Sequence, residues 1–498
     1  MKIGSFPSIL KNAIIIGIYK GGDKKEAKNY RPIALTSHLS KLMERIVRSN
    51  IVNYLDQNGL WDGRQHGSRK GRSTLSQLLE HHDSIMAALE EGHNIDVVYL
   101  DFAKAYDKVD HSVLLQKIRA LGIGGKLGSW IGSFLLNRTQ EVNVNNHKSH
   151  KSQVLSGIPQ GSVLGPLMFL IFVSDMGSQS SSKSYLYVDN AKVLEKIDNE
   201  KDVNKFQDNL ELYYTWARDN NMTYNDTKFV LLRYGKNENI KNDYLYFTDD
   251  MKEVIESHEN QRDLGIQMSN SGSFEFHIDS IIKKARQRIG WICRTFRHRE
   301  AMFMRRMFIT FVRPHLDYCS QLWSPNEGPL LDKIEKVLKD FTNLIPEIHH
   351  LEYCDRLKYL NMTSMQRRYD RYKIMYIKKI LCNLVPNIGI NIRHTSSHRN
   401  GLMLDTMNPK VSVLRSTTFQ FTAPKLFNLL PKDLRNHDGS MDNFKLHLDE
   451  FLSLIPDEPR LDKGSKLYSN TLEHQLNNWS WTIKFDHSRL VRAQPFSM

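Results

Sequence analysis

Two aspartates stand where carboxylates could do chemistry together. Asp101 lies near the end of the β-rich run DVVYLDF (96–102), where alternate side chains face opposite sides and the acid lies opposite the most apolar residues. Asp189 falls between YLYV (185–188) and AKVLEK (191–196), and Asp189-Asn190 is expected to form the turn of a tight hairpin. If both elements belong to one sheet, the two carboxylates share one edge. Such hard oxygen ligands suit Mg²⁺, and paired cations assist in-line nucleotidyl transfer.

The spacing of apolar residues predicts the elements that position these acids. The loop SGIPQGS (156–162) leads into a helix that is apolar nearly all round, so that helix should be central. The other predicted elements are a strand at 13–19, helices at 37–59, from about 75, at 111–122 and at 125–138, paired strands at 140–144 and 151–155, a helix at 202–219, a strand at 229–235 and a helical region from about 277.

Length and composition indicate an intracellular globular protein of roughly three domains. Its 69 Lys and Arg against 55 Asp and Glu give a formal charge of +14, which favours a polyanionic partner, although a merely basic surface has the same composition. The four cysteines are scattered, which is typical of free thiols in a reducing compartment. No segment reaches the ~18 apolar residues of a membrane span. The N-terminus lacks the pattern of a signal peptide.

Basic residues are concentrated in one helical stretch. Between Lys283 and Arg313 the sequence has ten Lys or Arg and a single acid, Glu300, and aromatic residues are interleaved among them. This pattern suits a surface that follows a phosphate backbone. A helix pair with a solvated basic face would give the same pattern.

Several motifs occur in an order that resembles the reverse transcriptases of non-LTR retrotransposons, the LINE and jockey-like group. They are IYKGGDKKEAKNYRPIALTS, GSRKGRST, VYLDFAKAYDKVDH, SGIPQGSVLGP, YVDN, YNDTK, RDLGI and FVRPHLDYCSQLWSP. The resemblance implies an α+β right-hand polymerase with fingers, an antiparallel-sheet palm and a helical thumb. It implies fingers and palm at 1–270, a thumb at 271–350 and an α-rich C-terminal region of unknown role at 351–498.

The resemblance also implies roles for individual residues. Asp101 and Asp189 are similar to the family's catalytic, metal-binding carboxylates, with the backbone carbonyl of Phe102 as a further ligand to Mg²⁺ or Mn²⁺. Tyr106 resembles the aromatic residue beneath the incoming sugar, but could be a core tyrosine. Gln160 resembles a residue that contacts the incoming nucleotide.

Lys20 and Arg31 resemble the family's finger residues that hold the triphosphate, although each could be an ordinary surface base. Lys228 is expected near the leaving pyrophosphate. The resemblance places Arg69, Lys70 and Arg72 at the backbone of the RNA template. In the basic helical stretch, the residues expected to contact the RNA template or the DNA primer are Lys283, Lys284 and Arg286.

The chain departs from the family pattern in three places. Asn190 replaces the usual second aspartate, which removes a negative charge, and Val188 replaces a small residue. The N-terminal endonuclease domain of full elements is also expected to be missing. The alternatives are therefore an active RNA-directed DNA polymerase, an inactive remnant that binds RNA or primer-template duplex, and a maturase-like splicing factor, which the C-terminal region disfavours. A nuclear or cytoplasmic location is expected.

Overall fold

A computed structural model describes residues 4–225, 228–235, 243–247, 252–326, 328–393, 401–407, 412–459 and 470–478. The chain forms two compact units, Met1–Gly272 and Ser273–Met498, each of which is described by itself. The boundaries predicted at 270 and 350 for fingers and palm, thumb and C-terminal region stay predictions. No described helix is both long and apolar enough to cross a membrane.

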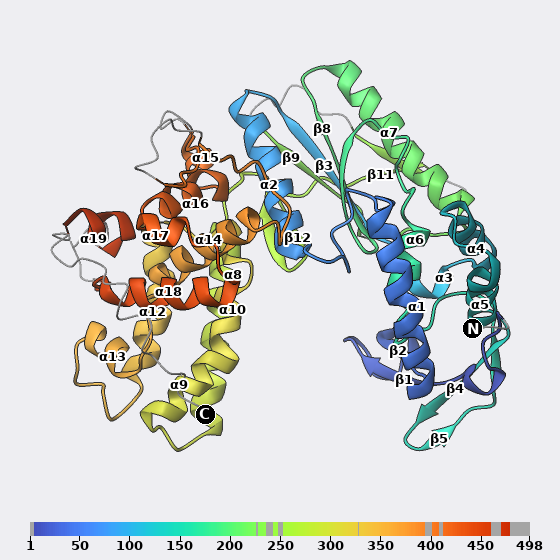
Figure 1. Ribbon diagram of the computed structural model, residues 1–498, viewed down its shortest axis with the longest axis horizontal. Helices are drawn as coiled ribbons and strands as arrows, with labels where there is room; N and C mark the ends of the chain where they lie inside the picture. The colour runs from blue at the N-terminus through green and yellow to red at the C-terminus, as the bar shows by residue number, and fades with distance from the viewer. Residues whose placement is uncertain are drawn as a thin grey trace. The chain divides into compact units, whose positions relative to one another are not determined.

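The first unit combines two larger sheets with helices (Figure 1). Its elements are η1 (Ser8–Leu10), β1 (Asn12–Tyr19), η2 (Ala27–Asn29), β2 (Tyr30–Leu35), α1 (His38–Gln57), α2 (Thr74–Glu90), β3 (Ile95–Leu100), α3 (Ala105–Lys108), α4 (His111–Ala120), α5 (Gly125–Leu135), β4 (Arg138–Val144), β5 (His147–Lys148), β6 (Ser152–Val154), α6 (Gly165–Phe172), β7 (Lys183–Tyr187), β8 (Asn190–Lys196), α7 (Glu200–Asp219), β9 (Val230–Tyr234), β10 (Leu245–Phe247), β11 (Lys252–Val254), β12 (Asn260–Asp263) and β13 (Ile266–Ser269). The strands and helices predicted in this part of the chain are confirmed, with ends shifted by a few residues.

The N-terminal sheet has the order β2-β1-β4-β5, with β6 also paired to β4. The predicted pairing of the strands near 140–144 and 151–155 is confirmed, since β4 and β6 are antiparallel. The parallel pairing of β1 with β4, from Asn12↔Thr139 to Ile15↔Val142, was not predicted. This sheet carries β2, the strand that contains Arg31.

The second sheet has the order β7-β8-β3-β9, and every pair in it is antiparallel. β3 therefore lies between β8 and β9, with Leu100 opposite Ala191 in the register of β3 and β8. The prediction that the two acid-bearing elements are neighbours in one sheet is confirmed. All six residues of β3 are buried, so both faces of this strand are covered.

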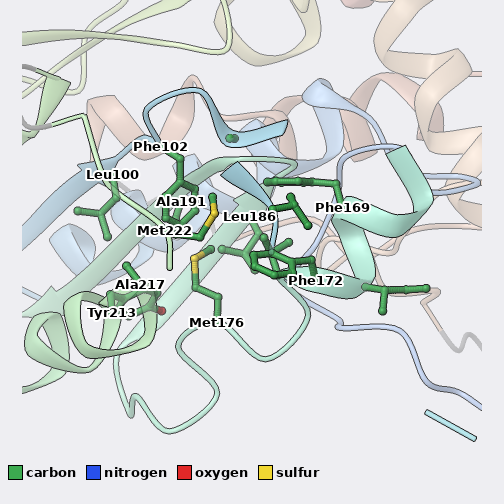
Figure 2. Close-up of a cluster of buried hydrophobic side chains, with 14 of the residues drawn as sticks. Leu100, Phe102, Phe169, Phe172, Met176, Leu186, Ala191, Tyr213, Ala217 and Met222 are labelled. Carbon is green, nitrogen blue, oxygen red and sulfur yellow. The ribbon is translucent and has the colours of Figure 1, made fainter. Parts of the chain in front are cut away.

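Helices and a strand pair cover the two faces of this sheet, which explains the burial of β3. On one face, α6 and α7 pack against Leu100, Leu186 and Ala191 (Figure 2). The prediction of a central α6 is confirmed, because all but one of its eight residues are buried. On the other face, His81 of α2 packs edge-on against Tyr99, and Lys192 of β8 forms a buried ion pair with Asp263 of β12.

The described part of the second unit is helical, apart from an isolated bridge between Ile392 and Leu404. The elements of this unit are α8 (Glu275–Thr295), α9 (Ala301–Met307), the π-helical turn η4 (Phe308–Val312), α10 (Arg313–Asp317), α11 (Ser320–Trp323), α12 (Pro329–Asn343), α13 (Tyr353–Tyr359), α14 (Met365–Leu381), α15 (Val413–Ser416), α16 (Phe419–Asn428), α17 (Lys432–Arg435), α18 (Met441–Leu454) and α19 (Leu472–Asn478). α8 buries one face, including Ile278, Ile282 and Ile292, and leaves its lysines and arginines exposed.

Candidate active site

The register of the antiparallel sheet brings the two predicted carboxylates together. Asp101 directly follows β3, and Asp189 lies in the turn between β7 and β8. The backbone after β3 is held by a second segment, because Asn225 N–H donates to the Asp101 carbonyl at 2.8 Å and Ala103 N–H donates to the Thr223 carbonyl at 2.9 Å. Both acids thus lie at one end of the sheet, and the backbone of Asp101 is fixed by the segment that contains Thr223 and Asn225.

Burial and neighbouring charges both shift the pKa of the Asp189 carboxyl. Burial raises the pKa of its carboxyl most, and the negative charge of Asp101 raises this pKa further. The positive charges of Lys228 and Arg31 act in the opposite direction. Lys228 also forms an ion pair with the carboxylate of Asp101. The predicted residues Asp101, Asp189, Arg31 and Lys228 therefore form one electrostatic group.

The hairpin tip differs from the prediction in its register. Tyr187 pairs with Asn190, so the two turn residues are Val188 and Asp189, and Asn190 is the first residue of β8. Val188 has a φ of 58°, which is unfavourable for a β-branched residue and costs on the order of 1 kcal/mol or more. The prediction of an Asp189-Asn190 turn is therefore wrong. Asn190 lies instead beside the acid, with its Nδ2 at 3.5 Å from Asp189 Oδ1.

Tyr106 packs on the central helix and lies near the carboxylate group. Its ring stacks on Phe169 of the central helix α6, with centroids 4.9 Å apart and planes 10° apart. Burial, and secondarily the charge of Asp189, raises the pKa of Tyr106 to about 12. Tyr106 is therefore a half-buried residue that packs on α6, and the charge of Asp189 affects its pKa.

Gln160 is held by two contacts that connect separate parts of the first unit. Its Nε2 donates to Asp107 Oδ1 at 2.9 Å, and its backbone carbonyl accepts from Ala34 N–H of β2 at 2.6 Å. Gly161 permits this approach, because a Cβ there would lie 2.5 Å from the Ala34 carbonyl oxygen. Asp107 is not among the site residues predicted from the sequence. Its only signal there is its place in the same DFAKAYD block as Asp101.

Other predicted residues are not brought into the carboxylate group. Lys20 is exposed just beyond β1, and its backbone N–H donates to the Asn29 carbonyl. Arg69 donates to the Asp62 carbonyl and lies over the Trp61 ring, whereas Lys70 is exposed. Arg72 donates to the Gly63 carbonyl. Arg69 and Arg72 therefore each use a hydrogen-bond donor within their own loop. Lys283, Lys284 and Arg286 are exposed on α8 of the second unit.

The donor set fits a divalent cation of the Mg²⁺ type. Asp101 and Asp189 supply hard carboxylate oxygens, and their mutual repulsion, visible in the raised pKa of Asp189, is what a cation between them relieves. Among the residues that the structure describes, no cluster of three or more His, Cys, Asp or Glu is placed to hold a metal. Any metal here would therefore need further ligands, such as a backbone carbonyl, water or substrate phosphate.

The antiparallel sheet with α6 and α7 packed on one face and two carboxylates at one end defines the palm of a right-hand polymerase. Residues 22–268 match the family model described as "Reverse transcriptase (RNA-dependent DNA polymerase)". The chain therefore carries a reverse transcriptase domain and is related to the RNA-directed DNA polymerases of non-LTR retrotransposons.

Two curated relatives show the extent of this similarity. The probable RNA-directed DNA polymerase from transposon BS of Drosophila melanogaster is 33% identical over 177 residues, which are 35% of this chain and 19% of the relative. The RNA-directed DNA polymerase from mobile element jockey of Drosophila funebris is 28% identical over 349 residues, which are 67% of this chain and 37% of the relative. The chain thus spans well under half the length of either relative.

A solved structure, apo telomerase from Candida tropicalis, aligns with a TM-score of 0.42 at 12% sequence identity. The alignment covers 75% of this chain and 62% of that chain. The assignment to reverse transcriptases rests on the sequence family instead.

Proposed function

We propose that this protein is an RNA-directed DNA polymerase of a non-LTR retrotransposon, which extends a DNA 3′ end on an RNA template with deoxynucleoside triphosphates. The observation that carries the proposal is the convergence of Asp101 and Asp189 at one end of the palm sheet. The match of residues 22–268 to reverse transcriptases supports the choice of an RNA template over a DNA template. A nuclear or cytoplasmic location is proposed with this function.

The two carboxylates and the Phe102 carbonyl would hold the Mg²⁺ or Mn²⁺ ions. Bound there, such ions stabilise the attacking and leaving oxygens of an in-line displacement. The buried Phe102 ring stacks on Tyr224 with centroids 4.5 Å apart, which fixes the backbone beside Asp101. The aspartates must be ionised to bind the ions, so the raised pKa of Asp189 shifts the lower limit of metal binding to a higher pH.

The cations beside the carboxylates suit the triphosphate of the incoming nucleotide. Arg31 on β2 and Lys228 both act on Asp189, so a phosphate chain bound at the acids would lie within the reach of their charges. Lys20, farther along the β1–β2 hairpin, is proposed to contact the triphosphate only if that hairpin closes over it. Tyr106 would lie beneath the sugar, and Gln160 would contact the nucleotide.

The template and primer are proposed to contact basic residues by charge. Such phosphate contacts position a nucleic acid without reading its sequence. The proposed residues are Arg69, Lys70 and Arg72 in the first unit and Lys283, Lys284 and Arg286 in the second unit.

A second candidate function is binding of RNA or primer-template duplex without polymerisation. Asn190 favours it, because the amide beside Asp189 carries no charge and adds less to cation affinity than a carboxylate would. This candidate shares the proposed nucleic-acid contacts and differs only in the chemical step.

Primer extension separates the two candidates. The purified chain is given a primed RNA template, deoxynucleoside triphosphates and Mg²⁺ or Mn²⁺. Extension that disappears in Asp101→Ala and in Asp189→Ala, while duplex binding is retained, supports the polymerase. Binding without extension in the wild-type chain, with extension appearing in Asn190→Asp, supports the second candidate.

A further inference from the structure

The short segment Arg64–Gly67 lies along the free edge of β7, next to the hairpin tip that carries Asp189. Gln65 and Leu186 form a parallel bridge. His66 N–H donates to the Leu186 carbonyl at 2.9 Å, and Leu186 N–H donates to the Arg64 carbonyl at 3.0 Å. The segment thus pairs with the outer edge of β7 through one parallel bridge, at the end of the sheet where the acids lie.

The side chain of Gln65 contacts the turn itself. Its Oε1 accepts from Val188 N–H at 2.9 Å and from Gly67 N–H at 2.7 Å. Its Nε2 lies 3.5 Å from the Val188 carbonyl oxygen, at the limit of a hydrogen bond. That carbonyl belongs to the same peptide plane as the nitrogen of Asp189. Gln65 therefore contacts both peptide planes that flank Val188, including the one that begins the catalytic residue.

Burial and close packing hold the contact between Gln65 and the turn in place. Gln65 is only 3% exposed, so water does not readily replace its bonds. A Cβ on Gly67 would lie 2.5 Å from Val188 Cγ2 and 2.7 Å from its backbone nitrogen, so the segment packs directly on the turn. Arg64 anchors the preceding residue, because its guanidinium donates to the Met176 and Gly177 carbonyls and pairs with Asp62.

We propose that Gln65 is a positioning residue for the cation site, because it fixes the left-handed turn at Val188 and thereby the place of the Asp189 carboxylate relative to Asp101. The turn conformation is unfavourable for valine, so the turn needs a partner that holds it. This inference rests on the proposed polymerase function only for its catalytic readout. The predicted effect on cation binding is independent of that function.

The test compares Gln65→Met with Gln77→Met. Gln77 is a matched buried amide on α2 that bonds Lys192 Nζ at 2.9 Å instead of contacting the turn. Mn²⁺ binding is measured by electron paramagnetic resonance without nucleic acid or nucleotide. Gln65→Met should weaken Mn²⁺ binding by about 10-fold or more, the scale expected for residues that support metal ligands. Gln77→Met should leave Mn²⁺ binding unchanged even if it lowers thermal stability.

Primer extension adds a second readout. In Gln65→Met, kcat should fall and the Mg²⁺ concentration for half-maximal rate should rise, with a smaller change in the KM for nucleotide. Equal Mn²⁺ affinity in Gln65→Met and wild type would overturn the inference. Absence of extension in the wild-type chain would instead count against the proposed function, and the Mn²⁺ comparison would still decide the role of Gln65.

Two further measurements keep the inference testable if Gln65→Met does not fold. Gln65→Glu retains an acceptor for Val188 and Gly67, loses the amide donor and adds a negative charge, so it should fold and bind Mn²⁺ at least as tightly as the wild-type chain. In the wild-type chain, the Val188 amide should exchange its hydrogen slowly although it lies in a turn. Exchange at the rate of an open loop would contradict the proposed contact.

Discussion

At the scale of single residues, the proposed cation site depends on the contrast between the carboxyl of Asp189 and the uncharged amide of Asn190. Asp189 is a partly buried carboxyl whose pKa is raised, and its neighbour Asn190 offers only an amide at 3.5 Å. An amide oxygen can ligate a cation but contributes no net charge. The cation affinity of this site should therefore be limited by residue 190.

Asn190→Asp should increase the affinity for Mg²⁺ or Mn²⁺ by about 10- to 100-fold. The added carboxylate should also raise the pKa of Asp189 further, because like charges lie side by side. The gain should therefore be larger at pH 8 than at pH 6. Mn²⁺ titrations of Asn190→Asp, Asn190→Ala and wild type check this. An affinity of Asn190→Asp no higher than that of Asn190→Ala would show that residue 190 does not face the cations.

The sequence predicted most of these residue types but not their exact placement. Asp101, Asp189, Arg31 and Lys228 were found because short motifs carry them. The turn was assigned one residue too late, because Asp-Asn is a common turn pair and valine at positive φ is not. No local pattern in the sequence points to Gln65, since its contact with Val188 joins residues 123 positions apart.

At the scale of elements, the loop with Gln160 connects the two larger sheets of the first unit. The Gln160 carbonyl accepts from Ala34 of β2, and the Gln160 side chain donates to Asp107, which belongs to α3 after β3. The relative position of β2 and the palm sheet therefore depends on how closely this loop approaches β2. Gly161 sets that approach.

Gly161→Ala should displace the loop, because the new Cβ would lie 2.5 Å from the Ala34 carbonyl oxygen. We expect a stability loss on the order of 1 to 3 kcal/mol and a higher KM for nucleotide in primer extension. Gly92→Ala is the control, since Gly92 also has a positive φ, 90°, but a Cβ there meets nothing within 4 Å. Denaturant unfolding measures both variants, and equal losses would attribute the effect to backbone conformation alone.

Periodicity predicted the elements well because each is a local property. α1 and α7 both begin at polar side-chain caps, Ser37 and Asn199, and both carry an apolar stripe. The parallel pairing of β1 with β4 could not be predicted, since no local pattern specifies which distant strand is the neighbour. The burial of both faces of β3 likewise depends on α2 and β12, which the strand's own alternation does not reveal.

At the scale of the whole molecule, positive charge is distributed over two compact units. Lys283, Lys284 and Arg286 are exposed on α8 and leave the apolar face of that helix to the core of the second unit. Such residues bind a polyanion through release of counterions. Their contribution should therefore be visible in the salt dependence of binding.

Replacing Lys283, Lys284 and Arg286 together by Ala should weaken binding to an RNA–DNA duplex and reduce the slope of log K against log salt by about 2 to 3. The control replaces Lys333, Lys336 and Lys358 by Ala. This change removes the same charge, but these three lysines pair with carboxylates. Fluorescence anisotropy at several salt concentrations measures both. Equal slopes for the two triple variants would indicate that net charge, not the α8 surface, determines binding.

The ion pair of Lys228 with Asp101 links cation occupancy to the position of a segment of chain. A divalent ion held by the aspartates would compete with that ammonium group for the same oxygens, so each would disfavour the other by an equal free energy, as reciprocity between two ligands requires. Lys228, released from Asp101 in this way, would be available to pair with an anionic phosphate chain.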